Sequence, residues 1–361
     1  MQSFAEPSWL PVRWSDWISF LCTESSARPL AIVRICLGSY LVIYWIELAS
    51  FLDLYFLAPP MLFLDDLTTV PWYGAIRLVG ESTLCRQLLF VGTALASICL
   101  AIGCCTRLAS LSLWWMTQSW LEFPVGQNSG DFLVRIAVFL IMLSSLAGHS
   151  QAIWSLDAWW RRGSGRTRGI PAWPLRLFQI QLVLMYFFAG LYKVAGVGWF
   201  EGEALYYVFQ HTLWRRFDLS WVRDPISIGL LTYGTIIFEL LLFPLLIWFR
   251  RWRPWVLLAG LMFHAGIWLA ARVFVFSCIV PIYYLAFVDD DLWQSIWEIA
   301  LIKVRSVSSR INQLTSQRPP TALHGCNPQH QPTAFATQTR QAAGVCVKME
   351  KVAHTGVKQQ G

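Results

Sequence analysis

Long apolar stretches separated by short polar segments recur along most of this chain, and they constrain its fold more than any other feature. A helix needs about 20 apolar residues to cross the hydrocarbon core of a bilayer. Such stretches occupy residues 30–52, 87–104, 108–123, 132–147, 175–194 and 228–249, and residues 254–288 are long enough for two more. The chain is 56% hydrophobic and only 14% charged, which is typical of a multi-spanning membrane protein. We predict an all-α polytopic transmembrane bundle of about eight spans, with seven or nine as alternatives.

Basic residues in the short loops orient these spans. The loop at residues 148–173 holds Arg161, Arg162, Arg166 and Arg168, and the stretch at 228–249 is followed by further arginines. Loops rich in Lys and Arg stay on the cytoplasmic side, so the end of the stretch at 175–194 is predicted at the outer face and both termini at the inner face. The net charge of +7 reflects these signals and contact with anionic lipids; no nucleic-acid partner is expected.

The segments outside the spans differ in composition. Residues 1–29 are rich in Trp and lack a signal-peptide pattern, which predicts an interfacial segment before the transmembrane domain at 30–288. The composition of residues 289–305 predicts an amphipathic interfacial helix. Residues 306–361 have almost no aromatic side chains, which predicts a disordered tail. The nine cysteines lack the spacing of a metal site or a disulfide framework, so we expect no metal.

Three ionisable residues in or near successive predicted spans, Lys193, Glu239 and His264, are candidate catalytic residues. A charge at membrane depth is costly unless it snorkels, is paired or loses its charge, so such residues often mark sites. Each has a structural alternative: Lys193 can snorkel to the headgroups, and His264 can be a neutral imidazole bonded to a neighbouring helix. Glu239 lies about 15 Å below the outer end of its span, so a direct pair with Lys193 requires a water-filled cavity or an offset between helices.

A second set of charged residues is predicted to brace the bundle. It comprises Arg34, Asp131 and Arg135, together with Glu47. Arg34 and Glu47 lie about 20 Å apart along one helix and cannot pair. Asp131 and Arg135 are four residues apart at a helix start, where an acid is favourable and an i,i+4 pair is expected. The chain has no nucleotide-binding glycine loop, HExxH zinc motif or GxSxG elbow.

The residues around Lys193 form a specific pattern, Ala-Gly-x-x-Lys-x5-Trp-x-Glu-Gly, over residues 189–202. Softer strings accompany it: Arg28-Pro29-Leu30-Ala31-Ile32-Val33-Arg34-Ile35, Asn128-Ser129-Gly130-Asp131, Ser155-Leu156-Asp157-Ala158 and Gln179-Ile180-Gln181. Together they resemble the horizontally transferred transmembrane (HTTM) domain, the bacterial relative of the membrane part of vitamin K-dependent gamma-glutamyl carboxylase. The resemblance covers residues 28–287 and implies a multi-pass protein of the bacterial inner membrane.

The resemblance also implies site residues and co-substrates. A lysine of this string is the proposed base of the animal carboxylase and falls on Lys193, whereas the second lysine that precedes it there is Tyr192 here. An intramembrane acid would match Glu239 and a histidine would match His264. The implied co-substrates are reduced vitamin K or menaquinol, oxygen and carbon dioxide. The candidate substrate-binding residues are Tyr192, Trp199, Glu201 and Phe188.

Two functions from different classes follow. The first is a gamma-glutamyl carboxylase-like lyase that uses a lipid-soluble quinol and oxygen to generate a base, removes a proton from a peptide or protein substrate and captures carbon dioxide. The animal enzyme has a large C-terminal half that recognises propeptides, and only a low-complexity tail stands in its place here. The alternative is a non-enzymatic membrane protein, either a small-solute or proton transporter or a scaffold, although no inverted repeat supports transport.

Overall fold

The computed structural model describes residues 13–49, 83–120, 129–161, 169–212, 215–295 and 298. All of them belong to the unit Met1–Ala300, one of two units in the chain. The other unit, Leu301–Gly361, lies outside the described residues. The predicted tail, most of the predicted helix at 289–305 and the beginning of the N-terminal segment therefore lie outside them as well.

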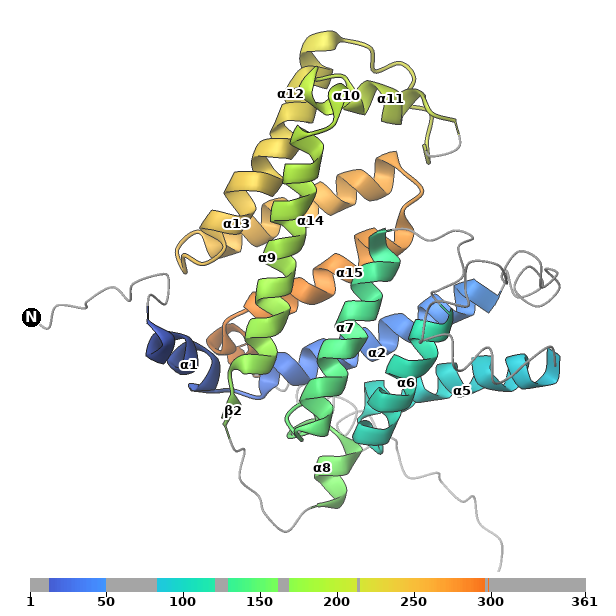
Figure 1. Cartoon of the computed structure of the whole chain (residues 1–361), viewed down its shortest axis with the longest axis vertical. Helices are drawn as coiled ribbons and strands as arrows, with labels where there is room; N and C mark the ends of the chain where they lie inside the picture. The colour runs from blue at the N-terminus through green and yellow to red at the C-terminus, as the bar shows by residue number, and fades with distance from the viewer. Residues whose placement is uncertain are drawn as a thin grey trace, which may run out of the picture. The chain divides into compact units, whose positions relative to one another are not determined.

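Each predicted span falls on helical residues in the described part of the chain (Figure 1). The helices are α2 (Arg28–Ala49), α5 (Thr83–Ile102), α6 (Thr106–Trp120), α7 (Ser129–Leu146), α9 (Trp173–Val194), α12 (Pro225–Ile237) continued by η4 (Phe238–Leu242) and α13 (Phe243–Leu246), α14 (Arg253–Ala270), and α15 (Phe274–Tyr284) continued by η5 (Leu285–Phe287).

Five of these helical segments are long and apolar enough to cross a membrane, among the residues described: Arg28–Ala49, Ser129–Leu146, Trp173–Val194, Pro225–Leu246 and Arg253–Ala270. Shorter apolar helices cover Gln87–Ile102 and Val275–Phe287. The all-α membrane architecture is thus confirmed, while the span count of eight stays a prediction.

Proline and capping residues explain where several of these helices begin. Pro174, Pro225 and Pro254 occupy the first or second position of α9, α12 and α14, where the missing N–H costs nothing. Asp224 additionally caps α12, because its carboxylate accepts the backbone N–H of Ser227 at 2.8 Å.

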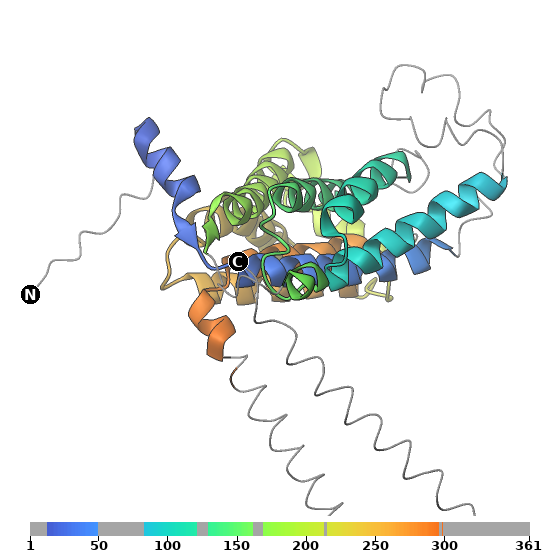
Figure 2. The ribbon, with the colours of Figure 1, turned by 90° about the horizontal axis from the view of Figure 1, so that it is seen from below.

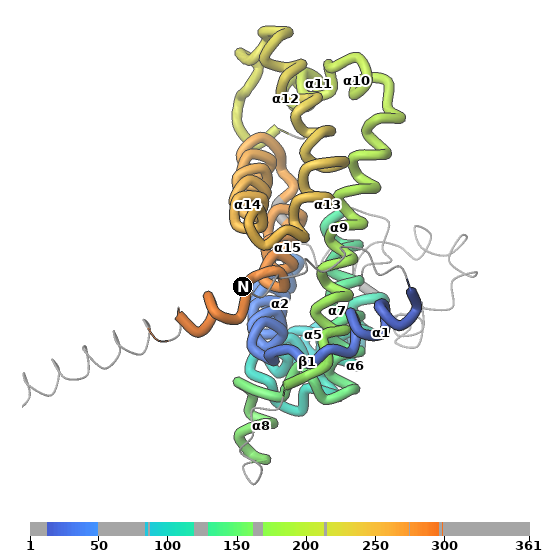
Figure 3. The backbone as a smooth tube through the Cα atoms, turned by 90° about the vertical axis from the view of Figure 1, so that its left-hand side faces the viewer, coloured from blue at the N-terminus to red at the C-terminus, as the bar shows by residue number. Residues whose placement is uncertain are grey.

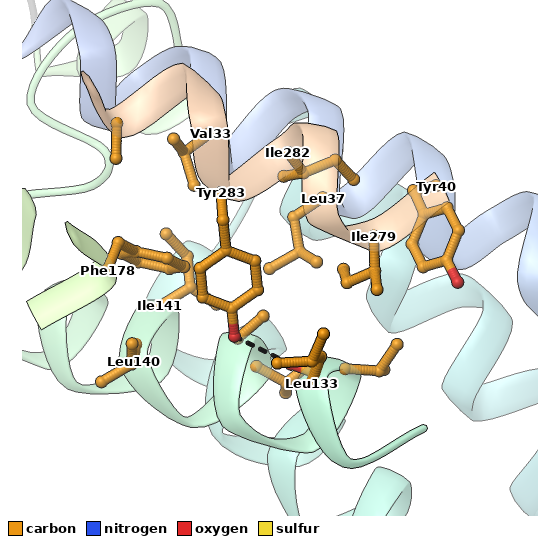
Figure 4. Close-up of a cluster of buried hydrophobic side chains, with 14 of the residues drawn as sticks. Val33, Leu37, Tyr40, Leu133, Leu140, Ile141, Phe178, Ile279, Ile282 and Tyr283 are labelled. Carbon is orange, nitrogen blue, oxygen red and sulfur yellow. Dashed lines mark hydrogen bonds between the residues drawn. The ribbon is translucent and has the colours of Figure 1, made fainter. Parts of the chain in front are cut away.

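The core lies between α2, α7, α9 and α15 (Figure 4). Tyr283 is fully buried there, and its hydroxyl donates to the carbonyl of Leu133 at 2.9 Å. Phe178 of α9 lies against the Tyr283 ring, with 5.4 Å between centroids. Gly38 of α2 lies so close to α5 that an added Cβ would lie 2.7 Å from the Ala101 Cα. The core is therefore packed tightly enough to fix the helices that surround the site.

Short elements gather at the two ends of the bundle (Figure 3). One end carries α10 (Val197–Phe200), α11 (Ala204–Gln210) and the start of α12, and the opposite end carries α8 (Leu156–Trp160). The positive-inside rule predicts that the α8 end, which lies within the basic loop at 148–173, is cytoplasmic. Lys193 is in the last turn of α9, toward the other end, and which side of the membrane each end faces stays a prediction.

The N-terminal helix α1 (Trp14–Cys22) projects from the bundle (Figure 2) and has no buried residue. Trp14 is 79% exposed, and Trp17 and Ile18 are also exposed. Behind it, β1 (Glu24–Ser25) pairs antiparallel with β2 (Ile170–Pro171), which ties the start of α2 to the start of α9. The interfacial position of this helix stays a prediction.

Candidate functional site

Lys193 and Glu239 form an ion pair between Nζ and Oε2, which joins α9 to η4. The side chains are 20% and 6% exposed. The sequence left open how a carboxylate in mid-span reaches the outer end of the preceding helix. An offset between the helices provides the answer: α12 extends beyond the end of α9 (Figure 1), so the middle of its span lies level with the last turn of α9.

Local backbone features bring the two side chains together. Glu239 lies in η4, a π-helical turn within an otherwise α-helical span; such turns often occur at functional sites. Gly190 of α9 packs directly on η4, since an added Cβ would lie 2.7 Å from the backbone nitrogen of Leu240. The glycine of the Ala-Gly-x-x-Lys string therefore permits the close approach that lets Lys193, one turn later, reach Glu239.

The segment after α9 folds back over the lysine. The Lys193 Nζ lies 5.2 Å from the centre of the Trp199 ring, within the range of a cation–π contact. The turn that follows contains Gly202, whose φ of +80° suits glycine, and the Tyr233 hydroxyl anchors it by donating to the Phe200 carbonyl at 2.8 Å. The Trp-x-Glu-Gly part of the string thus places the indole beside the ammonium.

A cavity of about 1060 Å³ adjoins the ion pair. Residues from α7, α9, α10, α11, α12, α14 and α15, together with Glu239 of η4, line it. Of the candidate binding residues, Phe188, Tyr192 and Trp199 lie on its wall, whereas Glu201 is exposed and does not line it. Lys193 and Glu239 supply the charged groups of a mostly apolar wall. The positions of these residues do not test their roles, so each assigned role stays a prediction.

His264 lies behind this wall. It is 1% exposed and does not line the cavity, but Phe263 and Phe276, which do, flank its ring at 5.5 and 5.0 Å between centroids. Its Nε2 is 2.8 Å from the hydroxyl of Tyr186, which in turn is hydrogen-bonded to the hydroxyl of Tyr284. The cation, the acid and the histidine are therefore neighbours, yet His264 belongs to a buried network.

Sequence reasoning missed Tyr186, Tyr284 and Gly190. Tyr186 is 1% exposed and its ring stacks on Phe243 with 3.9 Å between centroids. A signal was available, because residues 186, 190 and 193 share one helical face at i, i+4 and i+7. Through these three residues α9 contacts η4 and α13.

The second set of charged residues lies away from the cation–acid pair. Arg34 is fully buried and donates to the carbonyl of Trp154. Asp131 is 6% exposed and accepts from the Tyr44 hydroxyl at 2.9 Å, and Arg135 donates to the Gln118 carbonyl at 3.4 Å. These contacts link helices or loops to one another, which is compatible with the predicted bracing role.

Asp157 of α8 organises the α8 end of the bundle. Its carboxylate accepts the backbone N–H groups of Cys105 and Thr106, each at 2.8 Å, and so caps the start of α6. Burial alone raises the pKa of Asp157, but the hydrogen bonds from Thr106 and Cys105 and the charge of Arg161 more than offset it, so the pKa lies below its ordinary value. Asp157 belongs to the Ser-Leu-Asp-Ala string, one of the strings that resemble the HTTM domain, and in this structure it caps α6.

The cavity has the residue types of a small-molecule site. No group of His, Cys, Asp or Glu side chains suited to a metal ion is found among the described residues. The cavity volume lies at the upper end of the range for small-molecule sites, and the lining side chains are mainly apolar and aromatic. A fused aromatic ring with two oxygens suits such walls, with Lys193 and Glu239 available to its oxygens.

Comparison with known proteins supplies one match. A family model described as the HTTM domain matches residues 23–291, most of the chain. No curated protein and no solved structure matches the sequence significantly.

Proposed function

Because this chain belongs to the HTTM domain family, membrane proteins related to the vitamin K-dependent carboxylase, we propose that it is a quinol-dependent carboxylase. In this proposal it couples oxidation of a reduced vitamin K or menaquinol by oxygen to removal of a γ-proton from a glutamyl residue, followed by addition of carbon dioxide. Lys193 is the base, and Glu239 holds its proton.

The observation that supports the proposal most directly is the Lys193–Glu239 pair on the wall of an apolar cavity. Only a neutral amine can act as a base. Transfer of a proton from Nζ to the carboxylate produces a neutral amine and a neutral acid without moving net charge. After such a transfer the proton stays on Glu239, directly beside the amine.

The overall chemistry balances. When bound, a quinol supplies electrons for the reduction of oxygen: one oxygen atom ends in the epoxide of the quinone and the other in water. Removal of the glutamyl γ-proton breaks a C–H bond, and the electron pair left on carbon forms the new C–C bond to carbon dioxide. The residues of this chain hold and move the protons, and the Trp199 ring and apolar walls exclude water from the amine.

The test uses the full-length protein in lipid nanodiscs with reduced vitamin K, and separately with reduced menaquinone, under oxygen. Epoxide formation is expected from the wild type and at least about a 100-fold loss in Lys193→Ala. Lys193→Arg is the matched control, because it retains a charge for Glu239 but cannot serve as a base. Activity in Lys193→Arg would contradict the role of the lysine, and no epoxide from the wild type would contradict the redox chemistry.

Carboxylation and transport are separated by two further measurements. Labelled bicarbonate with a glutamyl peptide should leave label in the peptide only when Lys193 is intact. If no label is incorporated and liposomes containing the protein instead show a proton flux that Glu239→Gln abolishes, transport replaces carboxylation as the function.

A further inference from the structure

Two tyrosines and one histidine, each from a different helix, are linked in series by hydrogen bonds inside the bundle. Tyr186 of α9 lies between His264 of α14 and Tyr284 of α15, with 2.8 Å from its hydroxyl to the Nε2 of His264. Exposure is 1% for Tyr186, 1% for His264 and 6% for Tyr284. A buried chain of this kind is stable only when nearly all of its donors and acceptors are used.

Counting donors and acceptors selects one direction for the chain. If Tyr284 donates to Tyr186 and Tyr186 donates to Nε2, both hydroxyl protons are used and a neutral ring carries its proton on Nδ1. If the direction is reversed, the Tyr284 proton and the Nδ1 lone pair both lack a partner among the described residues. The first arrangement leaves one polar atom unpartnered and the second leaves two, so the first is favoured.

The remaining group is Nδ1–H. It is buried and has no hydrogen-bond partner among the described residues. The ring that carries it is flanked by Phe263 and Phe276, both of which line the cavity beside the ion pair. His264 itself does not line that cavity, so its unpartnered N–H lies behind the cavity wall.

We propose that Tyr186 and Tyr284 are positioning residues that fix His264 as the Nδ1–H tautomer. The proposal depends only on the hydrogen bonds of the protein. Tyr186 and Tyr284 act through His264 and touch no substrate.

The packing around the chain explains why it holds one geometry. Gly260, one turn before His264, leaves room for Tyr284, because an added Cβ would lie 2.9 Å from its Cζ. The Tyr186 ring is fixed by its stack on Phe243 and by edge contact with Phe238, 5.9 Å between centroids. The hydroxyl of Tyr186 can therefore be removed without removing the ring contacts that support η4.

The experiment is nitrogen NMR of the full-length protein labelled with ¹⁵N-histidine in nanodiscs. The chain has six histidines, and the resonances of His264 are those absent from His264→Gln. In the wild type, Nε2 is expected at the acceptor-type shift and Nδ1 at the protonated shift. Tyr186→Phe should move the Nε2 resonance away from the position of a hydrogen-bonded acceptor. Phe188→Leu should leave that resonance unchanged, because Phe188 lines the cavity and takes no part in these hydrogen bonds.

Protonated Nε2 in the wild type, or an unchanged spectrum in Tyr186→Phe, would overturn the positioning role. Neither result depends on epoxide formation, so a failed activity assay and a failed tautomer assignment remain distinct.

Discussion

The two ends of this bundle both bury a positive charge, and they hold it in different ways. The end with Lys193 is predicted to face outward and is called the outer site, and the end near α8 is predicted to face inward and is called the inner end. At the outer site, Lys193 is paired with a carboxylate on the wall of a cavity of about 1060 Å³. At the inner end, Arg34 is fully buried, donates to a backbone carbonyl, and lies against Gly103, whose φ is +70°. A lysine beside a carboxylate can exchange a proton, whereas an arginine bound to a carbonyl cannot.

The difference indicates what each charge does. A guanidinium packed on all sides connects α2 to the loop before α8 and serves the fold. An amine that adjoins a cavity and has a proton acceptor within reach can serve chemistry. If this distinction is correct, changes at the outer site should affect activity and stability together, and changes at the inner end should affect stability alone.

The largest effect is expected from splitting the outer ion pair. Lys193→Met leaves Glu239 buried without its partner, which should lower the free energy of unfolding by about 4 kcal/mol. Glu239→Gln should also destabilise, and the double variant should cost clearly less than the sum of the two, because neither charge is left unpaired. Unfolding by denaturing detergent in mixed micelles measures all three. Additive losses would mean that the two residues do not interact in the membrane.

The next effect concerns the glycine that allows this pair to form. Gly190→Ala places a Cβ against backbone atoms of Leu240, which cannot yield as a flexible side chain would, and should cost about 3 kcal/mol. Gly234→Ala in α12 is the matched control, since nothing lies within 4 Å of its added Cβ, and it should be neutral or stabilising. Equal effects in the two variants would show that close approach to Leu240 does not govern position 190.

The positions of the apolar helices could be predicted from the sequence because they depend on local apolar length; their orientation, which depends on arginines in loops, stays a prediction. The pairing of Lys193 with Glu239 could not, since it depends on how far α12 extends beyond α9 and on a π-helical turn that leaves no apolar signature. Only partners on other helices give the hydroxyl of Tyr186 a role. Distances along one helix are fixed by its rise, but contacts between helices are not.

At the inner end, Arg34→Met tests the other side of the comparison. It removes a charged hydrogen bond to the Trp154 carbonyl while keeping most of the volume, and should cost about 2 kcal/mol. Epoxide formation per folded molecule should stay within about threefold of the wild type, because Arg34 does not line the cavity. Loss of activity without loss of stability would assign Arg34 to the chemistry and remove the distinction between the two regions.

The smallest effect is expected at Asp157, and it depends on pH. The pKa of Asp157 in the folded protein lies below its ordinary value. Burial raises this pKa, but the hydrogen bonds from Thr106 and Cys105 lower it by more. A carboxyl group with a depressed folded pKa stabilises the fold fully above its unfolded pKa of about 3.9 and loses that contribution as the pH falls through the folded pKa. Asp157→Asn should therefore cost about 1 kcal/mol at pH 7.

The difference between Asp157→Asn and the wild type should shrink when unfolding is measured at progressively lower pH below about 4. Ser155→Ala is the control, because Ser155 caps α8 through a hydroxyl that does not titrate, accepting from Ala158 at 2.9 Å. Its stability loss should be independent of pH over the same range. A constant difference for Asp157→Asn would mean that the carboxylate charge contributes nothing to capping α6, and the inner end would then be held by packing and by Arg34.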